Sequence, residues 1–482
     1  MEIRKQTNRR KLLISMVVAV FIIFQGETAQ AQSAESSATT TPINKPRWQP
    51  EGQTQSASRT ANSTAGVMAL SLQEAIQLSI ANNLDTRLAS ERRNEATGAK
   101  IQALAALMPN VTGSASQASN TVNLASQGLT PEIFPIPTPF LGPFNSFDAR
   151  FQFAQSVFNL SSIRNFQSAH AGERLASLQE KLAREQVASL ASLAYLNALR
   201  SQSDVGTAQA NLNLAKSLLA LANNQKNAGI ATGVDVTRAE TRVADQETRL
   251  AQAETAEQTA ILNLLRATGL PLDSRPELTD PLEFDAQPAP VVEVALQTAA
   301  QDRVEIAIAE QEVKRLAYER KAAQAELYPS VDFVANYGSS GAQMNELALP
   351  TRSVGARLNI PIFNGGATAG RIKSARSRET QGQLRLDDTR RQVEQDVRNT
   401  LQTLDSSVKQ VHSAGQQVKL AERELEQSRD RFSAGVGDNI EVLNAQTALE
   451  NARNAQVSAL TAYNSARINL AAALGRAETF RW

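Results

Sequence analysis

The chain has 482 residues, no cysteine, two histidines and a formal net charge of +1 at pH 7. The lack of cysteine excludes disulfides and thiol nucleophiles, and two histidines leave almost no material for a His/Cys metal site. No basic stripe with interleaved aromatic residues indicates nucleic-acid binding, and we find no phosphate-binding loop, nucleophile elbow or dinucleotide fingerprint. We therefore predict a protein that is not an enzyme and has no cofactor, bound metal or nucleic-acid partner.

Residues 1–31 have the features of a secretory signal peptide. Basic residues precede an apolar run from Leu12 to Phe24, and Ala29-Gln30-Ala31 forms a small-residue cleavage site. The apolar run is shorter than the roughly 20 residues of a helical membrane span, so a retained anchor is the weaker alternative. Residues 32–70 are rich in Ser, Thr, Ala, Gln and Pro, which predicts a disordered linker.

The rest of the chain contains an internal repeat. The Leu-x-Pro-x-Val segment at 107–111 recurs at 327–331, and the segment at 228–241 recurs at 434–447. Such self-similarity predicts two copies of one structural unit. A Pro- and Phe-rich insertion at 128–143 distinguishes the first copy, as expected for a surface loop. The predicted organisation is a first unit at 71–274, a connector at 275–290 and a second unit at 291–482.

Each unit is predicted to contain helix, strand, strand, helix and helix. Pro109 and Pro329 end the first helices, because proline cannot continue a helical hydrogen-bond ladder. Beyond them the apolar period changes from 3.6 to 2, which is typical of a membrane barrel strand and also of a half-buried sheet. The apolar positions of these segments include Phe151, Phe153, Val331, Phe333, Val354, Leu358 and Ile360.

Two of the predicted helices are unusually long. No strong helix breaker occurs between Phe363 and Gly435, and apolar residues recur every seven positions from Val397 to Phe432. About 70 helical residues would span about 105 Å, which favours a coiled coil over a globular domain. The matching helix of the first unit is expected at about 161–227, and shorter helices at about 71–108 and about 233–268.

The helical hairpins are predicted to turn at Gly229 and Gly435, where a left-handed residue ends one helix. The following helices begin near Thr232-x-x-Asp235 and Asp438-x-x-Glu441. A hydroxyl or carboxylate at the cap and an acid three residues later predict capping boxes or close relatives of them.

These features together resemble the TolC-like outer-membrane efflux protein family. The resemblance rests on the two units, their Leu-x-Pro-x-Val strand entrances and the hairpin Ala-Gly-Val-x-x-x-Ile-Glu-Val-Leu-Asn-Ala at 434–445. It implies an α+β membrane protein: a homotrimer in which four strands per protomer close a twelve-stranded β-barrel, continued by a periplasmic α-helical coiled-coil tunnel. It further implies an outer-membrane channel of a Gram-negative bacterium that extends into the periplasm.

The resemblance also implies partners and site residues. An inner-membrane transporter and a periplasmic adaptor would deliver substrates for efflux or type I secretion, and the turns at Gly229, Gly435 and Val436 would dock the adaptor. Family members carry acidic residues that ring the closed pore, and Glu441 occupies one such position. Asn444 stands at the next one, which weakens a second ring.

The alternative is a soluble periplasmic coiled-coil protein, such as an adaptor, with its strands in a small β-domain. It explains the heptads, but not the two evenly placed strand pairs. Nor does it explain why seven of the fifteen phenylalanines lie between Phe134 and Phe158. The sequence does not distinguish among drugs, metals, solvents and polypeptides as the exported substrate.

Overall fold

The structure is a computed structural model, and it describes residues 68–127, 140–285, 288–343 and 348–482. The predicted signal peptide and residues 32–67 of the predicted linker lie outside the described residues, as do residues 128–139 of the predicted insertion.

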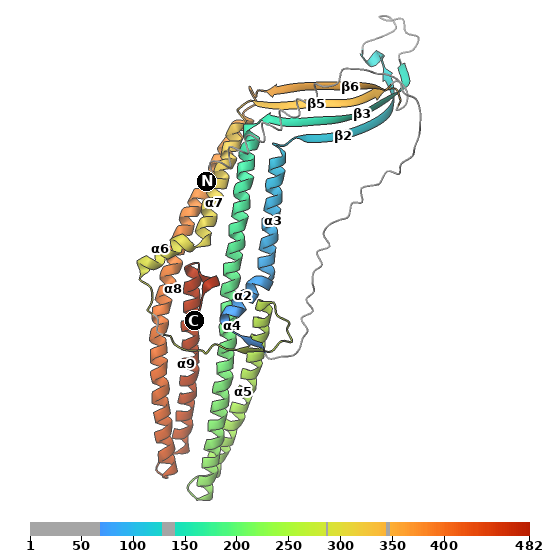
Figure 1. Cartoon of the computed structure of the whole chain (residues 1–482). Helices are drawn as coiled ribbons and strands as arrows, with labels where there is room; N and C mark the ends of the chain where they lie inside the picture. The colour runs from blue at the N-terminus through green and yellow to red at the C-terminus, as the bar shows by residue number, and fades with distance from the viewer. Residues whose placement is uncertain (1–67, 128–139, 286–287, 344–347) are drawn as a thin grey trace. The chain divides into compact units, whose positions relative to one another are not determined.

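Long antiparallel helices and one four-stranded sheet make up most of the described chain (Figure 1). The strands are β1 (Met68–Leu70), β2 (Asn110–Asn123), β3 (Phe140–Phe158), β4 (Pro276–Leu278), β5 (Ser330–Gly341) and β6 (Leu349–Asn359). The α-helices are α2 (Leu72–Asn82), α3 (Leu84–Ala105), α4 (Leu160–Asn227), α5 (Gly233–Thr268), α6 (Val292–Asp302), α7 (Val304–Ala325), α8 (Ala367–Ser433) and α9 (Asn439–Ala473). Two 3₁₀ turns, η1 (Ala125–Gln127) and η2 (Ala477–Thr479), complete the secondary structure of these ranges.

The two long helices form as predicted. Helix α4 has 68 residues and α8 has 67, which corresponds to about 100 Å each at 1.5 Å per residue. Helix α8 buries a stripe that includes Val397, Leu404 and Val411, at the predicted seven-residue spacing, in a core shared with Tyr463 and Leu470 of α9. A continuous apolar seam of this kind, rather than a thick core, stabilises the hairpin of α8 and α9.

The prediction of one uninterrupted helix at 71–108 is wrong. The chain is extended at Asn83, which separates α2 from α3, and likewise at Arg303, which separates α6 from α7. The Asn83 side chain accepts a hydrogen bond from the Asp85 N–H at 2.8 Å and so caps α3. The Arg303 guanidinium donates to the Ala472 carbonyl at 3.1 Å. Neither position is a glycine or a proline, so no strong helix breaker in the sequence marks either break.

The predicted linker is three residues too long. Met68–Leu70 pairs in parallel with Pro276–Leu278, inside the predicted connector. Leu70 is buried, and its carbonyl accepts a hydrogen bond from the Tyr195 hydroxyl at 2.9 Å. Asp280 accepts from the same hydroxyl and from the Leu72 N–H, both at 2.7 Å. Ordered structure therefore begins before Leu70 because a strand partner and a buried polar network are available there.

The four-stranded sheet is antiparallel, in the order β2-β3-β5-β6. The helices that adjoin it follow the same order, since α3 packs on α4, α4 on α7 and α7 on α8. Strand β2 and helix α3 therefore lie at one end of the row, and β6 and α8 at the other (Figure 1).

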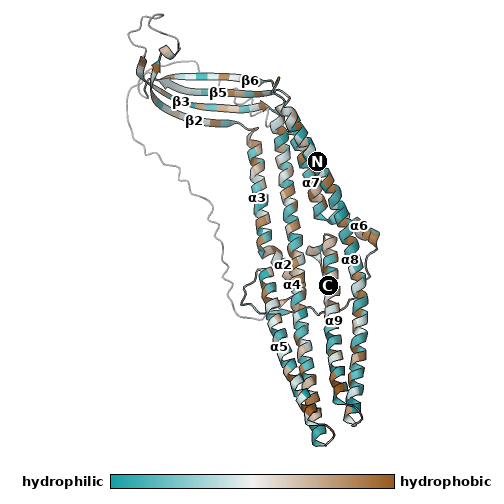
Figure 2. Cartoon of the chain, turned by 180° about the vertical axis from the view of Figure 1, so that it is seen from behind, coloured by the Kyte–Doolittle hydropathy of each residue, from teal (hydrophilic) through white to brown (hydrophobic). Residues whose placement is uncertain are grey.

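Polar residues are distributed along every labelled helix (Figure 2). Among the helices of the described ranges, none has the length and apolar character needed to cross a membrane.

Candidate functional site at the hairpin tips and the sheet

The first hairpin turns at Gly229, as predicted. This residue has a φ of +74°, a left-handed conformation that glycine adopts without steric cost. The Ile230 N–H donates to the Gln225 carbonyl at 2.9 Å, and the Gly229 N–H donates to the Lys226 carbonyl at 3.0 Å. These bonds occupy the last carbonyls of α4 and reverse the chain within a few residues.

The second hairpin turns in the same way at Gly435, whose φ is +71°. The Val436 N–H donates to the Arg431 carbonyl at 3.0 Å. A Cβ added to Gly435 would lie 3.5 Å from Cγ2 of Ile230, so the two tips are in contact. The turn geometry at both predicted positions is therefore confirmed.

Thr232 and Asp235 form the predicted capping box of α5. The Asp235 carboxylate accepts from the Thr232 hydroxyl at 2.7 Å and from the Thr232 N–H at 2.9 Å. Because these bonds stabilise the ionised form, the hydroxyl first and the N–H second, they hold the pKa of Asp235 below its ordinary value.

The predicted cap of α9 is correct for Asp438 and wrong for Glu441. The Asp438 carboxylate accepts from the Ile440 N–H at 3.2 Å. The Glu441 carboxylate instead lies 3.4 Å from Nε of Arg431, in the last turn of α8. A shorter aspartate at the cap position satisfies the helix end by itself, which leaves Glu441 free to pair with the guanidinium. Asn444 is exposed one turn further along α9.

Two side-chain hydrogen bonds that the sequence did not predict join the hairpins near their tips. Asn439 is buried, and its amide donates to the Asp235 carbonyl at 3.2 Å. Gln225 of α4 donates to the Ser433 carbonyl at 3.1 Å. Both donors are amides in ordinary helix-end positions, and no local pattern identifies their distant acceptors.

A buried carboxylate joins the hairpins further from the tips. Glu450 of α9 contacts the guanidinium groups of Arg242 and Arg249 on α5, and Nε2 of Gln246 lies 3.3 Å from it. The one available sequence signal was that Glu450, a charged residue, lies on the side of α9 that faces the core, directly after the buried Leu449. Sequence reasoning missed this cluster, because it depends on how α5 and α9 align.

Large apolar side chains are exposed at both tips. They belong to Ile230, Val234, Val436 and Ile440, and Val436 is the most exposed of them at 71%. Exposed apolar side chains that lie near one another are typical of a surface that contacts another protein.

Six of the predicted barrel residues project from one face of the four-stranded sheet. The register places Phe153 beside Ala335 and Ala335 beside Val354, and Val331 pairs with Leu358. Residues two apart on a strand share a face, as do directly paired residues. The shared face therefore carries Phe151, Phe153, Val331, Phe333, Val354 and Leu358. The rings of Phe153 and Phe333 meet edge to face at 5.9 Å.

The opposite face of the sheet carries mostly polar or small residues. One row across the four strands consists of Thr112, Gln152, Asn336 and Ser353. The prediction that Ile360 lies in a strand of the sheet is wrong, because β6 ends at Asn359, ahead of Pro361. A sheet with one exposed apolar face and one polar face fits a lipid boundary on one side and water on the other.

The arrangement can be compared with known proteins. A family model described as "Outer membrane efflux protein" matches residues 75–270 and 295–476. The chain belongs to this family. The predicted TolC-like outer-membrane channel for efflux or secretion is thereby confirmed, and so is its location in the outer membrane with extension into the periplasm.

The relatives in this family are distant. The pyoverdine export outer membrane protein OpmQ of Pseudomonas aeruginosa is 29% identical over 288 residues, which cover 58% of this chain and 59% of OpmQ. The outer membrane protein TolC of Escherichia coli is 24% identical over 352 residues, which cover 69% of this chain and 70% of TolC. The alignment thus leaves two fifths of OpmQ unmatched.

A solved structure shares the fold. The outer membrane protein VceC from Vibrio cholerae superposes with a TM-score of 0.71 at 21% identity, covering 84% of this chain and 96% of VceC. At this identity the likeness concerns the fold alone, and it covers most of this chain.

Proposed function

We propose that three copies of this chain close a twelve-stranded β-barrel in the outer membrane and that their helices continue it as a periplasmic duct. The observation that carries the proposal is the four-stranded sheet, whose end strands β2 and β6 each have one neighbour in the described residues. In a bilayer, unpaired edge groups cost several kcal/mol each, so the sheet must close on other copies. Four strands are too few for one copy to close alone, since the smallest such barrels have about eight.

The strand dimensions support the same proposal. Strands β5 and β6 have 12 and 11 residues, close to the 9–11 or so residues with which a tilted strand crosses a bilayer. In the proposed barrel the apolar face with Phe151 and Val354 contacts lipid, while the face with Gln152 and Asn336 lines the pore.

Each copy is proposed to contain two repeats, at 71–274 and 291–482. The same family model matches both halves separately, at 75–270 and 295–476. Two repeats of two strands and two hairpin helices per copy would give the assembly six similar units around its axis.

The hairpin tips are proposed as the docking site for a periplasmic adaptor that links the duct to an inner-membrane transporter. Gly229 and Gly435 set the turns, and Ile230 and Val436 present apolar groups there. Apolar groups of this kind are the usual anchors of protein contacts. Substrates would then pass through the duct passively, since the driving force belongs to the transporter.

The second tip is proposed to form the periplasmic gate, with Glu441 near the pore axis. The ion pair between Glu441 and Arg431 would partly neutralise the ring of carboxylates in the closed state. Helix caps at Asp235 and Asp438 would keep the tips rigid enough to close.

The test is the mass of the detergent-extracted protein. Mass photometry or multi-angle light scattering should give three times the 52.0 kDa of the full chain, less any cleaved signal segment. Planar bilayers should then show discrete conductance steps. A stable monomer would contradict the proposed barrel, because one sheet of four strands has no other way to satisfy its edges.

A further inference from the structure

Among the residues that the structure describes, Arg352 is the one charged side chain on the apolar face of the four-stranded sheet. It lies two residues before Val354 on β6, and residues two apart on a strand share a face. The other charged residues of the four strands lie on the opposite, mostly polar face: Asp148, Arg150, Asp332 and Arg357. A cation on a face that contacts lipid is costly, and the cost falls only near the membrane surface.

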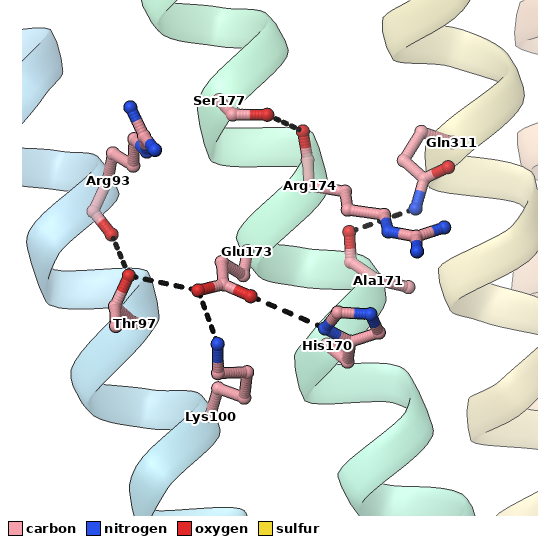
Figure 3. Close-up of polar contacts among 9 residues, drawn as sticks. All are labelled: Arg93, Thr97, Lys100, His170, Ala171, Glu173, Arg174, Ser177 and Gln311. Atoms are coloured by element: carbon pink, nitrogen blue, oxygen red, sulfur yellow. Dashed lines mark hydrogen bonds and ion pairs between the residues drawn. The ribbon is translucent and has the colours of Figure 1, made fainter. Parts of the chain in front are cut away.

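Arg352 has no counter-charge within its own chain. The residue is exposed, and its guanidinium pairs with no carboxylate of the described ranges. Other basic side chains do have such partners, since Arg150 pairs with Asp148 on the other face of the sheet. Between the helices, Lys100 of α3 bonds to Glu173 of α4 at 2.5 Å (Figure 3). Arg352 is therefore open to an anion from outside the chain.

Arg352 lies toward the end of the apolar face that is farther from the helices. Helix α7 leads into β5 at Ser330, and β6 leads out toward α8 at Asn359 (Figure 1). From Leu358, near that end, the strand rises about 20 Å to Arg352. Exposed apolar residues continue the face on the helical side: Ile360, Ile362 and Phe363. The apolar band of a membrane barrel is about 25 Å tall, so Arg352 marks its edge away from the periplasm.

Tyr337 of β5 lies directly beside Arg352 in the strand register. It is 58% exposed. Tyrosine is enriched where a membrane meets water, because its ring is apolar and its hydroxyl forms hydrogen bonds. Side chains of such a pair begin about 5 Å apart, so the hydroxyl and the guanidinium can donate to the same group. The planar guanidinium matches the oxygen atoms of a phosphate group, and the hydroxyl adds one donor.

The strand that would follow β6 in the proposed barrel leaves space beside Arg352. In that ring, β6 of one copy pairs with β2 of the next. Beyond Val111, the residues of β2 on the apolar face are small or polar: Gly113, Ala115, Gln117 and Ser119. Whichever of them faces Arg352, none is large enough to cover the guanidinium, so a lipid head group can approach it.

We propose that Arg352 and Tyr337 bind the phosphate group of a lipid in the outer leaflet of the outer membrane, at one site per copy. The guanidinium and the hydroxyl donate to the phosphate oxygens, and the acyl chains lie along the apolar face. The inference rests on the proposed barrel and adds a lipid site at its outer edge. The occupant is a phosphorylated lipid rather than a soluble anion, because the apolar side chains of Val354 and Phe333 continue the same face next to the cation.

Native mass spectrometry of the detergent-extracted trimer tests the site, with bisphosphorylated lipid A as the probe. The parent should retain up to three lipid molecules per trimer, one for each copy. Arg352→Gln should weaken binding by about tenfold or more, because charge-assisted hydrogen bonds to the phosphate are lost. Tyr337→Phe removes one neutral donor and should weaken binding by less than Arg352→Gln does.

Arg357→Gln is the matched control. It removes the same charge from the same strand, but on the opposite face and beside Asp332. This variant should bind lipid A as tightly as the parent does. Lipid A without phosphate groups should bind equally weakly to the parent and to Arg352→Gln. Inorganic phosphate is the second probe, and at the lipid's own concentration it should not displace the lipid.

The outcomes separate the lipid site from the barrel. Equal affinity of Arg352→Gln and the parent for lipid A, with both proteins trimeric, would overturn the site and leave the barrel in place. Monomers of the parent would overturn both. Displacement of the lipid by inorganic phosphate at equal concentration would show a general anion site and would also overturn the proposal.

Thermal dissociation of the trimer gives a second measurement. A ligand that binds only the folded assembly raises its stability. Lipid A should therefore raise the dissociation temperature of the parent and of Arg357→Gln by the same amount, and that of Arg352→Gln by less than half as much. The same rise in all three proteins would contradict phosphate binding by Arg352.

Discussion

Glu450 of α9 is 3% exposed and forms an ion pair with Arg242 of α5, so a single carboxylate joins the two helical hairpins of the chain. Arg249 and Gln246 complete its contacts. A buried carboxylate is costly to desolvate, and removing it would leave the mostly buried Arg242 guanidinium without its counter-charge. The cluster therefore fixes how the hairpins lie against each other.

The first prediction concerns this cluster. Glu450→Ala should lower the free energy of unfolding by about 3 kcal/mol, because the Arg242 guanidinium, whose side chain is only 15% exposed, would lose its partner. Thermal unfolding followed by circular dichroism measures the effect. Glu247→Ala is the control, since Glu247 is 57% exposed and 3.7 Å from Lys216, and its loss should cost less than about 1 kcal/mol. Equal losses in both variants would show that burial of Glu450 is not decisive.

The second prediction concerns the turn at Gly435. Gly435→Val should leave trimers in the membrane and abolish export, because a β-branched residue resists the left-handed conformation by about 1 kcal/mol or more. A Cβ at this position would make an ordinary contact with Cγ2 of Ile230 at 3.5 Å, so the strain comes from the backbone. Gly435→Asn is the matched control, since asparagine tolerates this conformation, and it should retain export. Normal export by the valine variant, with normal adaptor cross-linking, would show that the tips do not dock the adaptor.

The hairpin geometry was predictable because its determinants are local. Glycine at 229 and 435, and Thr232 with Asp235, act within one turn of helix and leave a signature in a few adjacent residues. The length of α8 was predictable because its seven-residue apolar repeat persists without a breaker. The apolar face of β5 and β6 was also predictable, because apolar and polar residues alternate along these strands.

The contacts between elements were not predictable, because they depend on the alignment of helices far apart in the sequence. Asn439 and Asp235 are 204 positions apart, and their hydrogen bond requires both tips to end at the same height. Arg303 interrupts a helix for reasons of tertiary structure, since its guanidinium reaches the Ala472 carbonyl. The sequence spacing alone assigned Glu441 to a helix cap. In the structure its carboxylate pairs instead with Arg431 of the preceding helix.

The third prediction concerns pH and the cap at Asp235. The pKa of this carboxyl is lowered in the folded protein from an ordinary value of 3.8, so folding favours its ionised form. Its contribution, about 1 kcal/mol, is therefore complete above pH 3.8 and is lost as the pH falls through the lowered value. The unfolding free energies of the protein and of Asp235→Asn should differ at pH 7 and converge in acid. Asp245→Asn, an exposed position on the same helix, should match the parent throughout.

The last prediction asks whether Glu441 acts in the pore. If the second tip forms the gate, three Glu441 carboxylates lie around one axis, each beside an Arg431 guanidinium. Two carboxylates 4 Å apart repel by about 1 kcal/mol in water and about 4 kcal/mol at an effective dielectric of 20, so the ring would attract cations. Glu441→Gln removes the charge without disturbing the cap, which Asp438 supplies. It should lower cation selectivity in planar bilayers, while Arg431→Gln should raise it by unmasking the carboxylates. The reversal potential under a salt gradient should therefore move in opposite directions for the two variants. Asp235→Asn, on the first tip, is the comparison and should leave it unchanged. Reversal potentials equal to the parent in both the Glu441 and Arg431 variants would show that this ion pair only links α8 to α9 and that the gate lies elsewhere.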